Sequence, residues 1–484
     1  MSQNPHTPRP GDDAPDFLEM LQQMLSSPEG GPLKDALSQM GIDKLDPAAM
    51  NLLAGQISGF FASAPADGID VSVCADIARK TVSKEGDAVV PDSVKAAVDG
   101  AVRVASLWVD SVTTFDSQPT AVHAWSRAEW VEATIHTWAD LVRPLAAGVG
   151  NAIAEAMTKQ LEQFGDGEMP QIPGMPALPP GTSMAAVIGQ MQPMLSRMSG
   201  SIFGVQFGQA VGTLAGDVVS GTEVGLPLVG HGVVAMLPAN VGSFGNGLEI
   251  DSNEVLLYLA TRECARVRLF ADVTWLGPQL VSAVQAYARD IRIDTERIQA
   301  TIEGMDPTNM EGLQEALSGE LFSPEPSPAQ QAALRRLETL LALVEGWVDI
   351  VADRATRSHL PHSAALGEAV RRRRATGGPA EELFARLVGL QLRPRRMRDA
   401  ANLFAALENS GGEALRDQAW SNPDTAPDAE DLDDVLAYVD RMVAGGSQDD
   451  VDLALEQLLA GAEDGADGGA EKSADGEKEN PDEK

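Results

Sequence analysis

The sequence contains little cysteine and few aromatic residues. Cysteine occurs only at Cys74 and Cys264 in 484 residues, which excludes a disulfide framework and a cysteine-based zinc site. Two thiols in a chain of this length are typical of a reducing compartment. Aromatic residues make up 5% of the chain, so leucine, valine, alanine and methionine must fill most of the core. An apolar content of 44% and this length are enough for two or three folded domains.

Basic residues are also scarce, because 36 lysines and arginines stand against 71 acidic residues and give a net charge of −35. Such a surface repels phosphate backbones and anionic lipids, so we expect neither general nucleic-acid binding nor membrane binding. The first 17 residues, "MSQNPHTPRPGDDAPDF", lack the apolar stretch of a signal peptide. We therefore expect a cytoplasmic protein, whose oligomeric state the sequence does not indicate.

Residues 197–217 form the longest stretch that resembles a membrane span. No residue between Arg197 and Asp217 is charged. Glycines recur there at every fourth position: Gly200, Gly204, Gly208, Gly212 and Gly216. Small residues at this spacing let a second backbone approach one side of a helix, and that packing must offset about 1 kcal/mol per glycine relative to alanine. The segment barely reaches a spanning length and contains Gln206 and Gln209, so we predict a buried helix of a soluble protein.

Apolar residues elsewhere recur mostly at intervals of three and four, which predicts a mainly helical fold. The run "EVGLPLVGHGVVAMLP" (223–238) is rich in β-branched residues and glycine and predicts one or two short strands. We expect a mostly disordered or weakly helical segment over 1–48, a helical region over 65–164 and a Pro/Gly-rich linker over 165–182. A second helical domain follows over 183–443. The acidic tail over 445–484 is predicted to be largely disordered, with a short helix at "DDVDLALEQLLAG" (449–461).

The stretch "LLYLATRECARVRLFADVTWL" (256–276) contains the spacing of the zinc-protease helix H-E-x-x-H. In that motif two imidazoles one turn apart bind a single zinc ion, and the glutamate acts as base on the bound water. Here Glu263 is present, but Arg262 and Arg266 stand where the histidines would be. Arginine stays protonated and has no lone pair for a metal. Glu263 is thus a candidate catalytic base without its metal ligands, or simply the partner of Arg266 in a surface pair on the helix.

Four blocks of the chain resemble an actinobacterial family of hydrolases with a zincin-like metalloprotease domain. They are "AWSRAEWVEATIHTW" (124–138), "FGVQFGQAVGTLAGDVVSGTEVGLPL" (203–228), the segment 237–291 around Glu263, and the segment 345–396 that begins "EGWVDIVADRA". The resemblance covers roughly residues 65–405. It implies a multi-helical zincin-like fold with few strands, a zinc cofactor and hydrolysis of peptide bonds.

The same resemblance assigns the remaining metal-site positions. Family members carry the last histidine of the motif where this chain has Arg266, and a downstream histidine in F-x-H-V-P-W-L where it has Asp272. The glutamate of a later E-G-x-x-D block corresponds to Glu345. The acidic positions therefore persist while the imidazoles are replaced, and we expect no bound cofactor.

Three functions follow as hypotheses from this pattern. The first is a catalytically degenerate member of the family that binds a peptide or protein partner. The second is an active metal-dependent peptidase in which Glu263 is the base and Asp272 and Glu345 bind a hard cation such as calcium, magnesium or manganese. The third is a structural helical scaffold. Convergence of Glu263, Asp272 and Glu345 in one pocket would favour the second.

Two further groups of residues are candidates for binding or reactivity. Arg371, Arg372, Arg373 and Arg374 form a basic island that suits an anion, or that docks on the protein's own acidic groups. Cys264 lies between two arginines, which lower a thiol pKa, although a buried and inert thiol is the alternative. His359 and His362 flank Pro361 and are expected in a surface turn.

Overall fold

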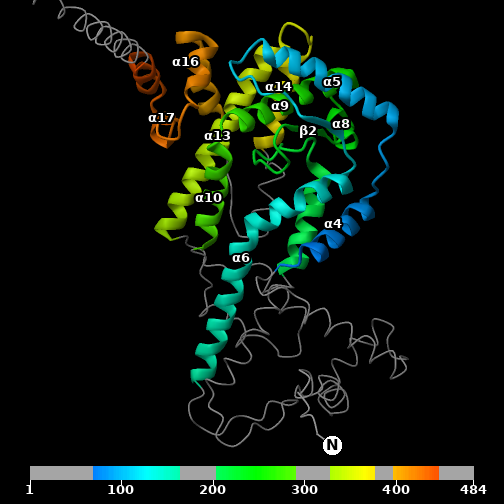
Figure 1. Ribbon diagram of the computed structural model, residues 1–484, viewed down its shortest axis with the longest axis vertical. Coiled ribbons are helices and arrows are strands. Elements are labelled where there is room, and N and C mark those ends of the chain that lie inside the picture. The colour runs from blue at the N-terminus through cyan, green and yellow to red at the C-terminus, as the bar shows by residue number, and fades with distance from the viewer. Residues whose placement is uncertain (1–68, 164–202, 290–326, 376–395, 446–484) are drawn as a thin grey trace, which may run out of the picture.

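The computed structural model describes residues 69–163, 203–289, 327–375 and 396–445. This part of the chain is mainly helical and has a single sheet of two short strands (Figure 1), so the predicted mainly-α fold class is confirmed. The predicted N-terminal segment 1–48, the linker 165–182 and the tail after Gly445 lie outside the described residues.

The elements follow the chain in three groups. The first contains α4 (Val71–Glu85), α5 (Asp92–Asp110), β1 (Ala121–Ala124) and α6 (Arg127–Gln163). The second contains a helix over residues 203–217, β2 (Val233–Met236), α8 (Pro238–Gly245), α9 (Ser252–Asp272) and α10 (Leu276–Arg289). The third contains α13 (Pro328–Thr356), α14 (Ser363–Ala375), α16 (Met397–Gln418), α17 (Ala429–Asp433) and a helix over 435–445.

The two long helices that carry the motif residues begin at clear capping side chains. The Asp251 carboxylate accepts a hydrogen bond from the Asn253 amide at the start of α9. Helix α13 begins with a reciprocal capping box between Ser327 and Gln330 and has Pro328 at its first position. These residues satisfy amide groups that have no partner within the helix, so local sequence fixes where both helices start.

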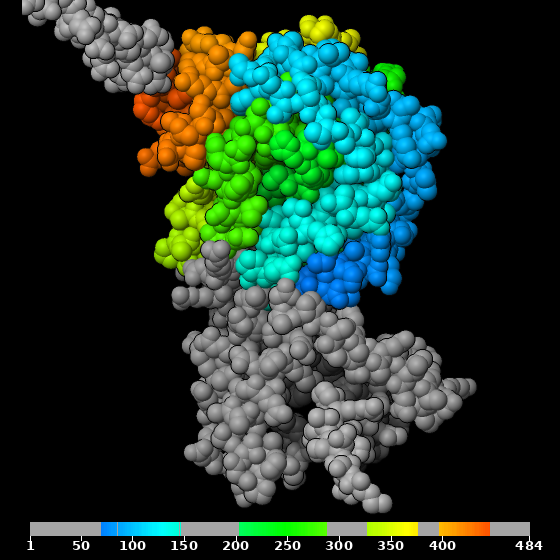
Figure 2. Space-filling view, viewed as in Figure 1, coloured from blue at the N-terminus to red at the C-terminus, as the bar shows by residue number. Residues whose placement is uncertain are grey.

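The small sheet joins the first and second groups of elements. Strand β1 pairs with β2 in parallel, with Ala121 opposite Val233, and Ser220 forms an antiparallel bridge to Met236 on the other side of β2. Helix α5 packs against α9, and α6 packs against α10. In Figure 2 the blue and cyan surface of residues 69–146 adjoins the green surface of residues 203–289. The strand predicted within 223–238 is confirmed as β2, whereas β1 was not predicted.

Helix α9 lies at the centre of the described fold. Every side chain from Tyr258 to Leu269 is buried, a pattern expected of a helix that is apolar on all sides. Yet this stretch includes Arg262, Glu263 and Arg266. The charged motif therefore lies inside the core, where each charge needs a partner.

The helix over residues 203–217, which carries the regularly spaced glycines, packs directly on α4. A Cβ atom at Gly208 would lie 2.7 Å from the Cys74 carbonyl oxygen, and one at Gly212 would lie 2.7 Å from the Ala78 carbonyl oxygen. Both distances are too short for any side chain, so these glycines permit backbone-to-backbone contact. Close packing of this helix, as predicted, is confirmed for the part from residue 203 onward. Within the described ranges, no helix has the length and hydropathy needed to cross a membrane.

Replacing Gly208 by alanine tests the packing of this helix. We expect Gly208→Ala to lower the free energy of unfolding by about 1–3 kcal/mol, because the new methyl group forces α4 away. Gly100 lies on the exposed side of α5, where a Cβ atom would meet no other atom within 4 Å, and Gly100→Ala should instead add up to about 1 kcal/mol through helix propensity. Urea unfolding followed by circular dichroism measures both; equal effects of the two substitutions would contradict the packing account.

Candidate functional site

The two motif arginines point at the same carboxylate on α13. The Arg262 guanidinium donates hydrogen bonds to Asp349 Oδ1 at 2.8 Å and to Glu345 Oε2 at 3.1 Å. The Arg266 Nε donates to Glu345 Oε1 at 3.1 Å. Residues four apart on a helix share one side, which explains why both side chains reach Glu345. Only 3% of Glu345 is exposed, so this is a buried ion-pair cluster between α9 and α13.

Glu263 occupies the other side of this cluster, and both of its carboxylate oxygens accept hydrogen bonds. Its carboxylate accepts hydrogen bonds from Ser220 Oγ (2.7 Å), the Thr222 amide (2.9 Å), Thr222 Oγ1 (2.9 Å) and the Arg266 guanidinium (2.9 Å). Its exposed fraction is 0%. A Cβ at Gly221 would lie 3.3 Å from its Oε1, so the loop over residues 218–225 lies directly on the carboxylate. The predicted Glu263–Arg266 pair exists, but the prediction that it lies on the helix surface was wrong.

The basic island at the end of α14 completes the cluster. Arg374 forms an ion pair with Glu345 Oε1 at 3.1 Å and donates a hydrogen bond to the Glu223 carbonyl at 2.7 Å. Arg373 donates to the Asp217 carbonyl, and Arg371 donates to Asp349 Oδ2 at 3.0 Å. These arginines thus hold the protein's own acidic groups, the end of the helix over 203–217 and the loop over 218–225.

The fourth arginine of the island, Arg372, points outward. Its side chain is 78% exposed and contacts Glu368 one turn earlier on α14. An exposed pair of this kind contributes little stability.

Burial and the arginines act on the two glutamates in opposite ways. Burial alone would raise the pKa of Glu345, but the guanidinium groups of Arg266, Arg374 and Arg262 outweigh burial and lower this pKa to about 2. Burial raises the pKa of Glu263, while Arg266 and the two hydroxyl groups oppose that rise. Glu345 is therefore firmly ionised, as three surrounding arginines require.

Cys264 is buried on the other side of α9 and is not poised to react. Its thiol is 3.9 Å from the Val102 carbonyl oxygen, and burial raises its pKa to about 12. The adjacent arginines direct their charge into the carboxylate cluster, so the inert thiol is the alternative that its surroundings support.

The remaining predicted site residues lie away from the cluster. Asp272 is nine residues beyond Glu263 on α9, about 14 Å along the helix axis, and its carboxylate accepts a hydrogen bond from the Ser117 amide at 3.2 Å. It therefore does not converge with Glu263 and Glu345. His359 stacks on Trp108 and His362 pairs with Glu254.

The donor set at this cluster does not fit a metal ion. No imidazole is present, and the carboxylates of Glu345 and Asp349 are already neutralised by Arg262, Arg266 and Arg371. Zinc requires deprotonated nitrogen, sulfur or oxygen ligands, and calcium or magnesium requires several free oxygens. Across the described ranges, no group of three histidine, cysteine or acidic side chains is placed to hold a metal.

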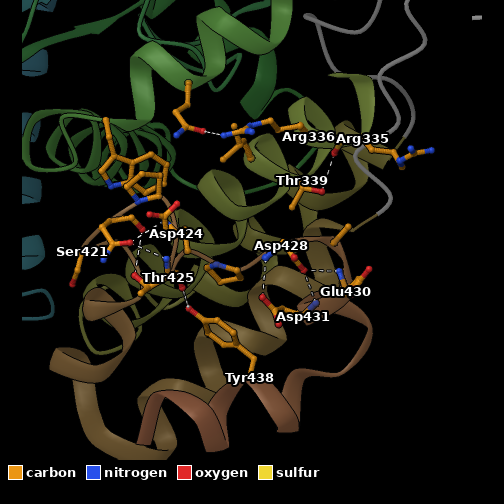
Figure 3. Close-up of a pocket in the computed structure, with 18 of the residues that line it drawn as sticks. Arg335, Arg336, Thr339, Ser421, Asp424, Thr425, Asp428, Glu430, Asp431 and Tyr438 are labelled. Atoms are coloured by element: carbon orange, nitrogen blue, oxygen red, sulfur yellow. Dashed lines mark hydrogen bonds between the residues drawn. The ribbon is translucent and has the colours of Figure 1, made fainter. Parts of the chain in front are cut away.

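A large groove lies elsewhere, between α13 and the segment from Ser421 to Gly445. Its volume is about 1480 Å³, and its lining includes Trp275, Tyr438 and several alanines of α13. Figure 3 shows Arg335 and Arg336 on one side, with an acidic wall opposite them. That acidic wall consists of Asp424, Asp428, Glu430 and Asp431. Sequence analysis missed this groove, because its walls come from segments about 90 residues apart.

Removing the central carboxylate should weaken the fold and change its acid stability. We expect Glu345→Gln to cost about 3–5 kcal/mol of unfolding free energy, because it leaves buried arginines without their partner. In the wild type, stability from Glu345 is present above its ordinary pKa near 4.5 and is lost as pH falls toward its folded pKa of about 2.

The variant should therefore lose less stability than the wild type between pH 5 and pH 3, as measured by urea unfolding at each pH. Glu368→Gln, at an exposed position paired with Arg372, is the matched control and should leave stability nearly unchanged. An equal effect of both substitutions would refute the central role of the buried cluster.

Comparison with known proteins places this architecture in a family. A family model described as zincin-like metallopeptidase matches residues 69–439. A crystal structure described as "a putative hydrolase with a novel fold" from Chloroflexus aurantiacus is similar in fold, with a TM-score of 0.52 and 16% identity over 77% of this chain and 98% of that chain. No curated protein matches the sequence significantly. Because the family model spans most of the chain and includes α9 and α13, the protein belongs to the zincin-like metallopeptidase family.

Proposed function

We propose that this protein is a catalytically inactive zincin-like protein that binds a polypeptide segment. The observation that carries the proposal is the environment of Glu263, the only candidate base in the motif. Its carboxylate accepts four hydrogen bonds and none of it is exposed.

A general base must lie within hydrogen-bond reach of the proton that it removes. Glu263 has no open side from which a substrate could approach, because Thr222 and Gly221 cover it. The raised pKa of Glu263 would suit a general base, but a substrate cannot reach its carboxylate. This supports an inactive site over a peptidase with unusual metal ligands.

The groove supports the binding part of the proposal. At about 1480 Å³ it exceeds the roughly 300–1000 Å³ of common small-molecule pockets, which favours an extended or helical peptide. Aromatic side chains, Trp275 and Tyr438, contribute to its lining, and charged groups stand on both rims. Apolar surface for affinity and charges for orientation suit a peptide that carries both kinds of side chain.

The scaffold and active-peptidase hypotheses predict different results for hydrolysis and peptide binding. A structural scaffold would show neither hydrolysis nor peptide binding, and an active peptidase would show hydrolysis that depends on Glu263. We also infer a reducing compartment such as the cytoplasm, supported by two free and buried thiols, Cys74 and Cys264.

We expect no peptide-bond hydrolysis by the purified protein. The assay uses an unfolded protein substrate with zinc, manganese or calcium added in turn, because the carboxylates at the motif are already paired with arginine. Glu263→Gln is the control for contaminating activity, since a genuine base would be lost in this variant. Cleavage that persists through purification and disappears in Glu263→Gln would restore the enzyme hypothesis.

We expect the groove to select peptides from a random displayed library. Ala332 lines the groove and is exposed on α13, and Ala332→Trp should weaken binding by about tenfold or more by filling the space, a loss of roughly 1.4 kcal/mol. Leu107→Trp, at an exposed position on α5, is the matched control. Isothermal titration calorimetry measures both; selected peptides that bind both variants equally well would place their site elsewhere.

A further inference from the structure

The chain exits the described fold at the rim of the groove. Gly445 ends the helix over 435–445 and is itself part of the groove lining. We propose that residues 449–463 of the same chain occupy this groove and compete with other peptides. This inference rests on the proposed function, because it takes the groove to be a site for polypeptide.

The distance is short enough for the segment to enter the groove. Three residues, Gly446 to Gln448, separate Gly445 from the segment. Extended chain covers about 3.3–3.6 Å per residue, so this connection spans roughly 10–14 Å. Glycine at its first position adds freedom to turn back.

The apolar residues of the segment match the apolar lining of the groove. At 3.6 residues per turn, four apolar residues of the segment, Val451, Leu455, Leu458 and Ala462, share one side of a helix. On the groove side, Ala286, Ala329, Ala332 and Ala333 present small side chains, and Leu340 and Met442 add apolar surface. Small residues let a helix with a leucine stripe approach closely.

The charges of the segment match the two rims. On the predicted helix over 449–461, Asp452 and Glu456 lie on one flank, while Asp450, Ala454, Gln457 and Gly461 form the other flank, which is neutral apart from Asp450. The acidic flank suits the α13 wall of the groove, and the neutral flank suits the wall that carries Asp424 and Glu430.

The α13 wall carries two exposed arginines that could pair with acidic side chains of the segment. Arg335 has no ion-pair partner among the described residues, and Arg336 contacts only the side-chain amide of Gln279 there. On the opposite wall, Asp428 caps α17 and Asp431 pairs with Arg441, so these two carboxylates are already engaged.

A disulfide cross-link in the full chain tests this contact. Ala332→Cys together with Leu455→Cys should form an intramolecular disulfide under mild oxidation, read by mass spectrometry. The native thiols should not interfere, because Cys74 and Cys264 are buried and their pKa values are raised to about 12. Leu107→Cys with Leu455→Cys is the control pair, because Leu107 is exposed on α5 and does not line the groove.

Charge substitutions decide whether the contact is specific. Arg335→Glu with Arg336→Glu should lower the cross-link yield by about tenfold, which corresponds to roughly 1.4 kcal/mol. Adding Asp452→Arg and Glu456→Arg should restore it. A yield equal to that of the control pair, or disulfides only between two chains, would overturn the proposal; the latter result would mean that a second copy fills the groove.

A separate measurement distinguishes this inference from the proposed function. Leu455→Asp with Leu458→Asp disrupts the apolar stripe and should strengthen binding of a selected library peptide by about tenfold. Unchanged peptide affinity and no intramolecular cross-link would reject the inference and keep the proposed function. A specific intramolecular cross-link, with no peptide binding by the wild type or by the double Asp variant, would reject the proposed function and keep the intramolecular contact.

Discussion

The buried ion-pair cluster around Glu345 is the interaction on which the rest of the structure depends. It joins α9, α13, α14 and the loop over 218–225 through hydrogen bonds and ion pairs of Arg262, Arg266 and Arg374. Removing such charges from water costs several kcal/mol per ion, and only a full set of partners offsets that cost. The cluster therefore restricts these four segments to one arrangement, and α9 can lie in the core despite its charged residues.

The cluster also gives the acidic positions of the zinc-protease motif positively charged partners. In the H-E-x-x-H motif, zinc brings two positive charges to this helix. Here Arg262 and Arg266 bring two positive charges to Glu345 and Glu263, from adjacent turns of the same helix. We interpret the arginines as electrostatic replacements for the ion. A guanidinium supplies charge and hydrogen bonds, but it cannot activate water as a Lewis acid.

The sequence predicted the helices well and the site only in part. Apolar periodicity was enough to predict a mainly helical fold, and the regular glycines indicated close packing against another backbone. The spacing of Glu263 and Arg266 predicted a pair but not its burial, because burial depends on α5, α13 and the 218–225 loop, which come from distant parts of the chain. Strand β1 has only four residues and forms because β2 offers an edge, a tertiary effect that local pattern does not contain. Asp272 was wrongly grouped with Glu263, although nine helical residues already separate them by about 14 Å.

The most direct test of this account is the zinc content of the protein before and after Arg262 and Arg266 are replaced by histidine. The wild-type chain, dialysed after incubation with zinc, should retain none by elemental analysis, because arginines occupy the ligand positions. Arg262→His with Arg266→His places two imidazoles one turn apart beside Glu345 and should retain about one zinc ion per chain, which a further Glu345→Gln should abolish. About one tightly held zinc ion in the wild type, or none in the folded double variant, would contradict the account.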